Sequence, residues 1–195
     1  MIGWNGRYHV CGNTYGTWLR GDPRGWRARH HREHVEGDYK NPPPEGTYAK
    51  LYRRSHDLLG KDPVLLDVAA REAAGKAMVE MLLHAGAEPI ALSVDRVHYH
   101  ILARFPDGQV RRPVGRAKKH ASFVLTALGV GGTAWGKRCK VKPIAHRKHQ
   151  LHVFNYIRQH ERNGAWAWTF REGLYWVAAG QSTMDFRRPR QSADQ

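Results

Sequence analysis

The alternation of apolar and polar residues predicts an α+β chain. Strands are expected at residues 7–11, 89–94, 97–105 and 137–142. The third of these has the clearest pattern: Val97, Tyr99 and Ile101 face one side. His98, His100, Leu102 and Arg104 therefore face the other side.

Helices are expected at residues 68–85, 113–128 and 148–162. Asp67 stands where an N-cap residue belongs, and Gly86 follows the same helix as a C-terminal glycine. The residues taken to form its apolar stripe are Val68, Ala69, Ala73, Ala77, Met81, Leu82 and Ala85.

The resulting element order is βαββαβ followed by a last helix, which suits a ferredoxin-like antiparallel sheet. In that fold two helices cover one face of the sheet, and the other face is left for a site. We expect one domain over residues 1–170, with a long excursion at 21–59 that contains a short helix near 48–59, and a C-terminal extension at 171–195.

Charge indicates the class of partner. The 195 residues include 32 Lys and Arg against 17 Asp and Glu, so the formal net charge is +15, which favours a polyanion. The basic residues are spread along the chain rather than gathered on one amphipathic helix, so nucleic acid is favoured over lipid; a merely solvated basic surface is the alternative. The expected phosphate contacts are Arg116, Lys118, Lys119, Arg138, Lys140, Lys142 and Arg147.

Other classes of protein are disfavoured by what the sequence lacks. No apolar run reaches the roughly 18–20 residues of a membrane span, and no signal-peptide pattern opens the chain. The two cysteines, Cys11 and Cys139, cannot build a disulfide scaffold, so we expect a reduced, cytoplasmic protein without a membrane partner. The phosphate-binding loop of ATP-driven motors is also missing.

Two short motifs carry candidate chemistry. His98 and His100 are two residues apart on one strand face, about 7 Å along the chain, so both rings can converge on one divalent metal. Tyr156 and His160 are four residues apart on the last predicted helix and therefore share a stripe. With 13 histidines, a His-x-His triplet is expected about once by chance. Surface histidines beside a nucleic-acid-binding face, and an aromatic stripe packed on the sheet, therefore remain alternatives.

Together these motifs resemble the HUH-type single-tyrosine transposases, in particular the REP-associated tyrosine transposases and their insertion-sequence relatives. The likeness rests on residues 94–102, VDRVHYHIL, and 156–160, YIRQH. Residues 15–26 and 117–122 also look like one subgroup of this superfamily. The similarity extends over roughly residues 7–170.

The resemblance implies a ferredoxin-like catalytic domain and a set of roles. His98, His100 and His160 would hold a divalent metal, Mg²⁺ or Mn²⁺, and Tyr156 would be the nucleophile. The implied activity is cleavage and joining of single-stranded or hairpin DNA during transposition, through a 5′-phosphotyrosine intermediate. Family members differ in whether the tyrosine helix serves its own subunit or a partner, so a homodimer stays open.

Two other functions compete with this one. A replication initiator or relaxase shares the HUH core, but no helicase domain follows here and only one tyrosine neighbours the expected ligand. In a non-catalytic nucleic-acid-binding module the histidines would only line a basic groove.

Overall fold

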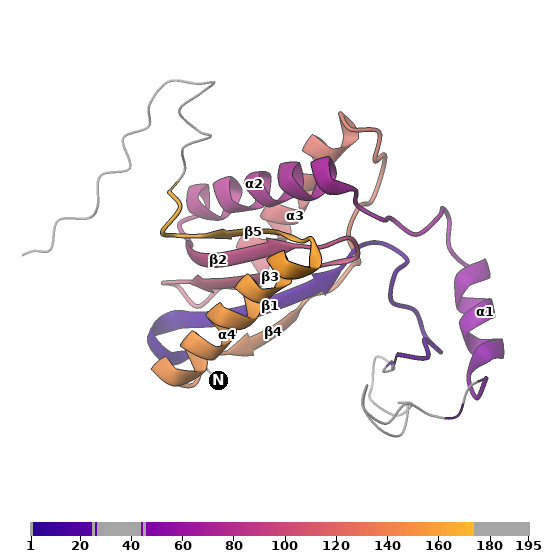
Figure 1. Ribbon diagram of the computed structural model, residues 1–195, viewed down its shortest axis with the longest axis horizontal. Coiled ribbons are helices and arrows are strands. Elements are labelled where there is room, and N and C mark those ends of the chain that lie inside the picture. Colours follow the sequence, from indigo (N-terminus) through magenta and orange to yellow (C-terminus); the bar gives the residue numbers. More distant parts are fainter. Residues whose placement is uncertain (1, 25, 27–43, 45, 174–195) are drawn as a thin grey trace, which may run out of the picture.

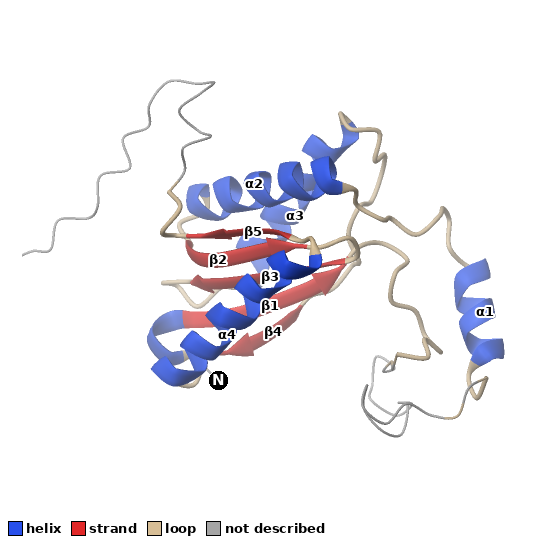
Figure 2. Cartoon of the chain, viewed as in Figure 1, coloured by secondary structure: helices blue, strands red, loops and turns tan. Residues whose placement is uncertain are grey.

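The computed structural model describes residues 2–24, 26, 44 and 46–173, and within them the chain forms an antiparallel sheet with helices on both faces (Figures 1 and 2). The strands are β1 (Arg7–Asn13), β2 (Glu88–Val94), β3 (His98–Arg104), β4 (Lys140–Pro143) and β5 (Trp166–Thr169). The helices are α1 (Ala49–Asp57), α2 (Val68–His84), α3 (Arg111–Thr126) and α4 (Arg147–Gln159), with short 3₁₀ turns at Trp4–Gly6 and His160–Asn163.

The sheet order β4-β1-β3-β2-β5 confirms the expected fold class. Its first four members follow the order of a ferredoxin-like βαββαβ unit, and all neighbouring pairs are antiparallel. The fifth strand, β5, was not expected from the sequence. It is four residues long, and it pairs with the edge of β2.

The main core lies between the sheet and the layer formed by α2 and α3. Tyr99 and Ile101 of β3 are fully buried there, in the same cluster as the α3 residues Val114 and Leu125. Gly12 of β1 makes room for Tyr99, because a Cβ at residue 12 would meet the Tyr99 hydroxyl at 2.7 Å.

The predicted N-cap of α2 is confirmed, since the Asp67 carboxylate accepts a hydrogen bond from the Ala70 amide. The predicted apolar stripe is wrong in part: Val68 is 70% exposed, whereas Ala70, Ala74 and Met78 are buried. Apolar residues occur all round this helix, so their spacing specifies no single face.

The second face of the sheet was expected to be free for a site, but a helix covers part of it. Helix α4 crosses it, in front of β1 and β3 in Figure 1. A smaller apolar cluster holds the helix there, in which Phe154 and Ile157 of α4 pack with Ala91 of β2 and Leu102 of β3. What remains open is the part of this face beyond the apolar cluster.

The predicted excursion contains α1, as expected, and this helix stands beside the sheet rather than on it (Figure 1). Hydrogen bonds from the Gly60 amide to the Tyr15 hydroxyl and from the Val64 amide to the Tyr15 carbonyl tie the returning chain to the end of β1. The middle of the excursion, 27–43, and residues 174–195 of the expected extension lie outside the described residues. Within the described chain, no helix combines the length and apolar composition needed to cross a bilayer.

Helix α2 carries a glycine in its interior because β5 packs against it. A Cβ placed on Gly75 would lie 2.0 Å from the Trp166 ring, which is well inside van der Waals contact. Glycine destabilises a helix by up to about 1 kcal/mol relative to alanine. At residue 75 that cost is offset because only glycine lets Trp166 of β5 pack this close to the helix.

Gly75→Ala should therefore destabilise the protein by about 1–3 kcal/mol, because the clash with Trp166 outweighs the gain in helix propensity. The matched control is Gly115→Ala in α3, where the described part of the chain has no heavy atom within 4 Å of the added methyl group. That change should stabilise by up to about 1 kcal/mol. Urea unfolding measures both, and equal stabilisation by the two variants would contradict this packing.

Candidate metal centre and tyrosine

The face of the sheet that carries α4 also carries a cluster of histidines. His98 and His100 project from β3, and on the neighbouring strand β1 Cys11 stands opposite His100 and His9 opposite Leu102. Residues directly opposite in a sheet project from the same face, so His9 and Cys11 join the two β3 histidines. The sheet alone thus brings four ligand-type side chains together.

Helix α4 adds His160, which begins the 3₁₀ turn after the helix. The His160 ring lies 4.7 Å from the His100 ring and 5.1 Å from the His98 ring, centroid to centroid. One ligand atom of each of these three residues lies within 4.8 Å of the others. The three histidines named from the sequence therefore meet in one place within a single chain.

Tyr156 lies beside this trio. Its ring centroid is 4.9 Å from that of His160 and 5.2 Å from that of His100, and it meets both rings edge-on. The side chain is 41% exposed, so it borders both the histidine cluster and solvent. Tyr99, which the sequence assigned to the other side of β3, is fully buried in the main core.

Burial keeps these imidazoles neutral. Desolvation, followed by the proximity of His9, His98 and His160, lowers the pKa of His100 to about 2. Desolvation and the charge of Lys142 lower the pKa of His9 to about 4. Desolvation also lowers the pKa of His98 and of His160, although Asp95 opposes both shifts. Neutral rings offer lone pairs at pH 7, which is the form that binds a cation.

The donor set fits a divalent metal. Within the described residues, the buried Nε2 of His160 has no hydrogen-bond partner. His98 and His100 lie close enough for all three side chains to bind one metal ion. Asp95 stands 3.6 Å from Nδ1 of His98, in the position of a carboxylate that orients a metal-binding imidazole. Ligand atoms around one ion lie about 3–3.5 Å apart, so a modest closing of the three side chains suffices.

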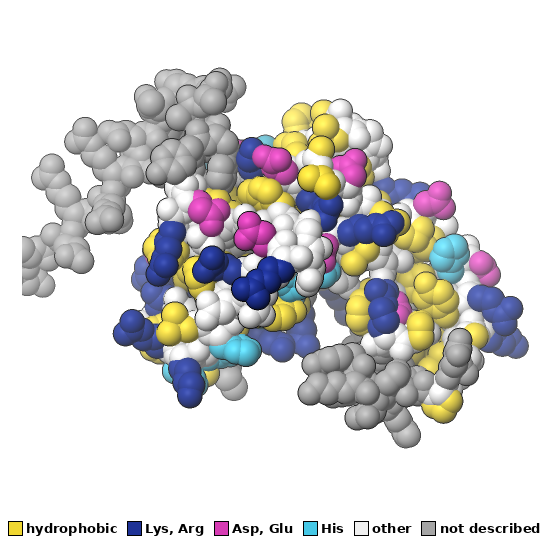
Figure 3. Space-filling model, in the orientation of Figure 1, with side chains coloured by type: hydrophobic (Ala, Val, Ile, Leu, Met, Phe, Trp, Pro, Cys, Tyr) yellow, Lys and Arg dark blue, Asp and Glu magenta, His cyan; other side chains and the backbone are white. Residues whose placement is uncertain are grey.

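The expected phosphate contacts fall on both sides of the sheet. Lys140 pairs with Cys11 and Lys142 with His9, so both lysines project from the face of the histidines. The α3 residues Arg116, Lys118 and Lys119 instead belong to the opposite layer. Figure 3 shows dark-blue Lys and Arg side chains around the histidine surface on the α4 side.

The remaining expected contacts are more distant or already engaged. Lys118 donates a hydrogen bond from Nζ to the Gly136 carbonyl, and burial lowers its pKa. Arg138 is exposed in the segment before β4, and Arg147 begins α4, about 20 Å along the helix from His160. The seven residues therefore do not form one surface.

Sequence reasoning missed Arg24, whose positive charge contributes to the lowered pKa of His98. Asp22, only 2% exposed, accepts hydrogen bonds from both Nε and Nη2 of Arg24, and Nη2 also donates to the Thr17 carbonyl. The guanidinium stacks on Trp18 at 4.7 Å from the ring centroid. This basic group is fixed in place at the edge of the histidine cluster.

His9 and Cys11 were also missed, and here a signal was available. They repeat the two-residue spacing of His98 and His100 on the first predicted strand. A ferredoxin-like topology places that strand beside the third one. Combining the spacing with the strand order would have added both residues to the site.

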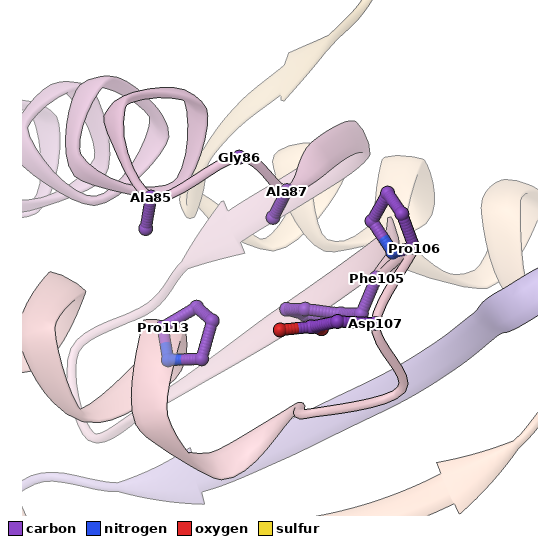
Figure 4. A pocket seen from close by; sticks show the side chains of 7 residues that line it. All are labelled: Ala85, Gly86, Ala87, Phe105, Pro106, Asp107 and Pro113. Carbon is purple, nitrogen blue, oxygen red and sulfur yellow. The ribbon is translucent and has the colours of Figure 1, made fainter.

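Two hollows in the described surface lie outside the cluster of histidines. One, of about 190 Å³, lies between the ends of α2 and β3 and the start of α3 (Figure 4). Phe105 and Pro113 are among the residues that line it. Phe105 follows the end of β3, about 20 Å along the strand from His98 at its start. The other, of about 470 Å³, lies between Gly21–Arg24 and the start of α1.

Comparisons with known proteins give a distant likeness to solved structures. No family model matches the chain, and no curated protein matches it. A solved structure described as "the REP associates tyrosine transposase bound to a REP hairpin" aligns over 98% of this chain and 92% of that one. The two are 15% identical, with a TM-score of 0.48. Because this likeness is distant, the roles of residues in this chain depend on their own geometry.

Proposed function

We propose that this protein is a metal-dependent single-strand DNA endonuclease and strand transferase that acts in DNA transposition through a covalent 5′-phosphotyrosine. The observation that carries the proposal is the meeting of Tyr156 and three histidines on the α4 face of the sheet. The motifs HYH and YIRQH, which suggested this chemistry from the sequence, supply those four side chains.

In this proposal His98, His100 and His160 hold the metal, with Asp95 orienting His98. A bound Mg²⁺ or Mn²⁺ would polarise a nonbridging oxygen of the scissile phosphate. Three nitrogen ligands favour Mn²⁺ over Mg²⁺, since imidazole is softer than the oxygen ligands that Mg²⁺ prefers.

Tyr156 supplies the nucleophile. The bond from its phenol oxygen to phosphorus forms as the bond from phosphorus to the 3′ oxygen breaks. The phenol proton passes to solvent, and the 3′ oxygen takes up a proton to become a free hydroxyl. The phosphodiester energy is kept in the phosphotyrosine, so the reverse attack by a 3′-hydroxyl can join strands without a nucleotide cofactor.

Positive charge on the same face would receive the DNA backbone. Lys140 and Lys142 project beside Cys11 and His9, and Arg24 stands at the edge nearest His98. Because Nε and Nη2 of Arg24 bond to Asp22 and Thr17, Arg24 would reach a phosphate through Nη1. The 47% exposed Trp18 beneath it offers a stacking surface for a base.

Tyr156→Phe should abolish the covalent adduct with a single-stranded hairpin oligonucleotide in the presence of Mn²⁺. Strand cleavage should fall by on the order of 10³-fold or more, because no phenol oxygen remains to attack. The free energy of unfolding should change by less than about 1 kcal/mol, since the ring stays and is already partly exposed. Denaturing gels of radiolabelled DNA measure both adduct and cleavage.

Tyr99→Phe is the matched control, because it removes a buried hydroxyl that has no hydrogen-bond partner among the described residues. It should leave adduct formation unchanged. An adduct that persists in Tyr156→Phe assigns the nucleophile to another residue. If the wild-type protein binds the hairpin but forms no adduct with either metal, the protein is a nucleic-acid-binding module instead.

The basic residues of β4 and those of α3 should differ in their effect on DNA affinity. Replacing both Lys140 and Lys142 with Gln should reduce the dependence of log Kd on log salt by about 1.4, at about 0.7 per lost phosphate contact. The double variant Arg116→Gln/Lys119→Gln removes the same charge from α3, on the other side of the sheet, and should change the slope little. Fluorescence anisotropy with single-stranded DNA at several salt concentrations measures both.

Equal losses in the two double variants would show that only the overall charge of the protein matters. A larger loss in the α3 variant would move the DNA to the opposite face, away from Tyr156.

A further inference from the structure

A second group of ligand-type side chains adjoins the histidine trio. His9 and Cys11 of β1 and His100 of β3 offer two imidazole nitrogens and one sulfur, all within 4.8 Å of one another. Nε2 of His9 and Nδ1 of His100 form a hydrogen bond of 3.0 Å, and the two rings stack. The proposed catalytic metal uses neither His9 nor Cys11, so this arrangement is unexplained by it.

The spacing of the two nitrogens suits a shared cation. Two nitrogens bound to one ion at about 2.0–2.1 Å lie about 3.0–3.4 Å apart. The 3.0 Å separation of His9 Nε2 and His100 Nδ1 falls in this range. Cys11 stands directly opposite His100 in the register of β1 and β3, which brings its sulfur to the same side.

The chemistry of this second group differs from that of the first. A thiolate is a soft ligand that selects Zn²⁺, Co²⁺ or Cd²⁺ and discriminates against Mg²⁺ and Mn²⁺. Cys11 is a free thiol. Burial raises its pKa, and the charges of Lys140 and Lys142 on the neighbouring strand oppose that shift only in part. They also oppose an added positive charge, so the thiolate's own charge is needed for binding.

We propose that His9, Cys11 and His100 form a binding site for one thiophilic divalent cation, of which Zn²⁺ is the physiological candidate. On binding, the Cys11 sulfur–hydrogen bond breaks, the sulfur–metal bond forms and the proton passes to solvent. Each histidine binds through the nitrogen that faces the other ring. The ring that donates the hydrogen bond between them moves its proton to its far nitrogen, and the acceptor ring already has its proton there.

This site excludes the catalytic one. A neutral imidazole has one lone pair, so His100 can serve either the set with His9 and Cys11 or the set with His98 and His160, but not both. Zn²⁺ in the first set should therefore inhibit DNA cleavage that depends on Mn²⁺. This inhibition rests on the proposed function, whereas the binding of the thiophilic cation does not.

Titration of the full chain with Co²⁺ tests the site directly, because a cobalt–thiolate bond gives an intense near-ultraviolet charge-transfer band. We expect the band in the wild-type protein and its loss in Cys11→Ser. Cys139→Ser is the matched control, since it removes the other free thiol, and should keep the band. His160→Ala should also keep it, because His160 belongs only to the other set. Circular dichroism confirms that each variant is folded.

Absence of the band in the wild type, its persistence in Cys11→Ser, or its loss in Cys139→Ser would each overturn the proposal. His9→Ala should weaken Co²⁺ binding at least tenfold, and unchanged affinity would remove His9 from the site. In a cleavage assay with Mn²⁺, Zn²⁺ should inhibit the wild type and inhibit Cys11→Ser at least tenfold less. If the wild type shows the cobalt band but no Mn²⁺-dependent cleavage, the proposed function fails and the thiophilic site stands.

Discussion

The packing of α4 across the second face of the sheet decides whether this chain has a site at all. The sheet by itself aligns His9, Cys11, His98 and His100, but the tyrosine and the last histidine come from a helix that follows β4. Ile157, fully buried against the sheet, fixes the rotation of that helix. Residues 156 and 160 are about 40° apart around the helix axis and lie on the same side of Ile157, so this one contact sets the direction of both side chains.

The cluster that results is costly for a protein without a ligand. Four imidazoles approach one another at ring distances of 4.7–5.2 Å, and burial disfavours their charged forms. One buried ring nitrogen of His160 is without a hydrogen-bond partner among the described residues. Such an arrangement contributes little as hydrophobic packing, since Phe or Leu would fill the same space without losing hydrogen bonds to water. A bound cation would use the lone pairs that the fold has desolvated.

The parts of the fold that follow strong local patterns were predictable. The alternation in 97–105 gave the correct two faces of β3, and Asp67 marked the start of α2. The face of α2 was not predictable, because alanines and other apolar residues surround it on all sides. β5 was missed because its four residues carry too short a pattern, and its place is set by the contact of Trp166 with Gly75, which is distant in sequence.

The candidate site divides in the same way. Spacing within single elements paired His98 with His100 and Tyr156 with His160, and the resemblance to the HUH-type transposases is what joined the two pairs into one expected site. Arg24 and the separation of the basic residues onto two faces depend on how elements pack. Charge counted along a chain does not show that α3 and β4 present their lysines to opposite sides of the sheet.

The most direct test of this account is Mn²⁺ binding by isothermal titration calorimetry to the wild type, to His160→Ala and to His152→Ala. His152 is an exposed histidine on the same helix, so its loss controls for the removal of any imidazole from α4. The account predicts one Mn²⁺ per chain in the wild type and in His152→Ala, and at least tenfold weaker binding in His160→Ala. A wild type that binds no Mn²⁺, or a His160→Ala variant that binds it equally well, would contradict the convergence of the three histidines on one metal.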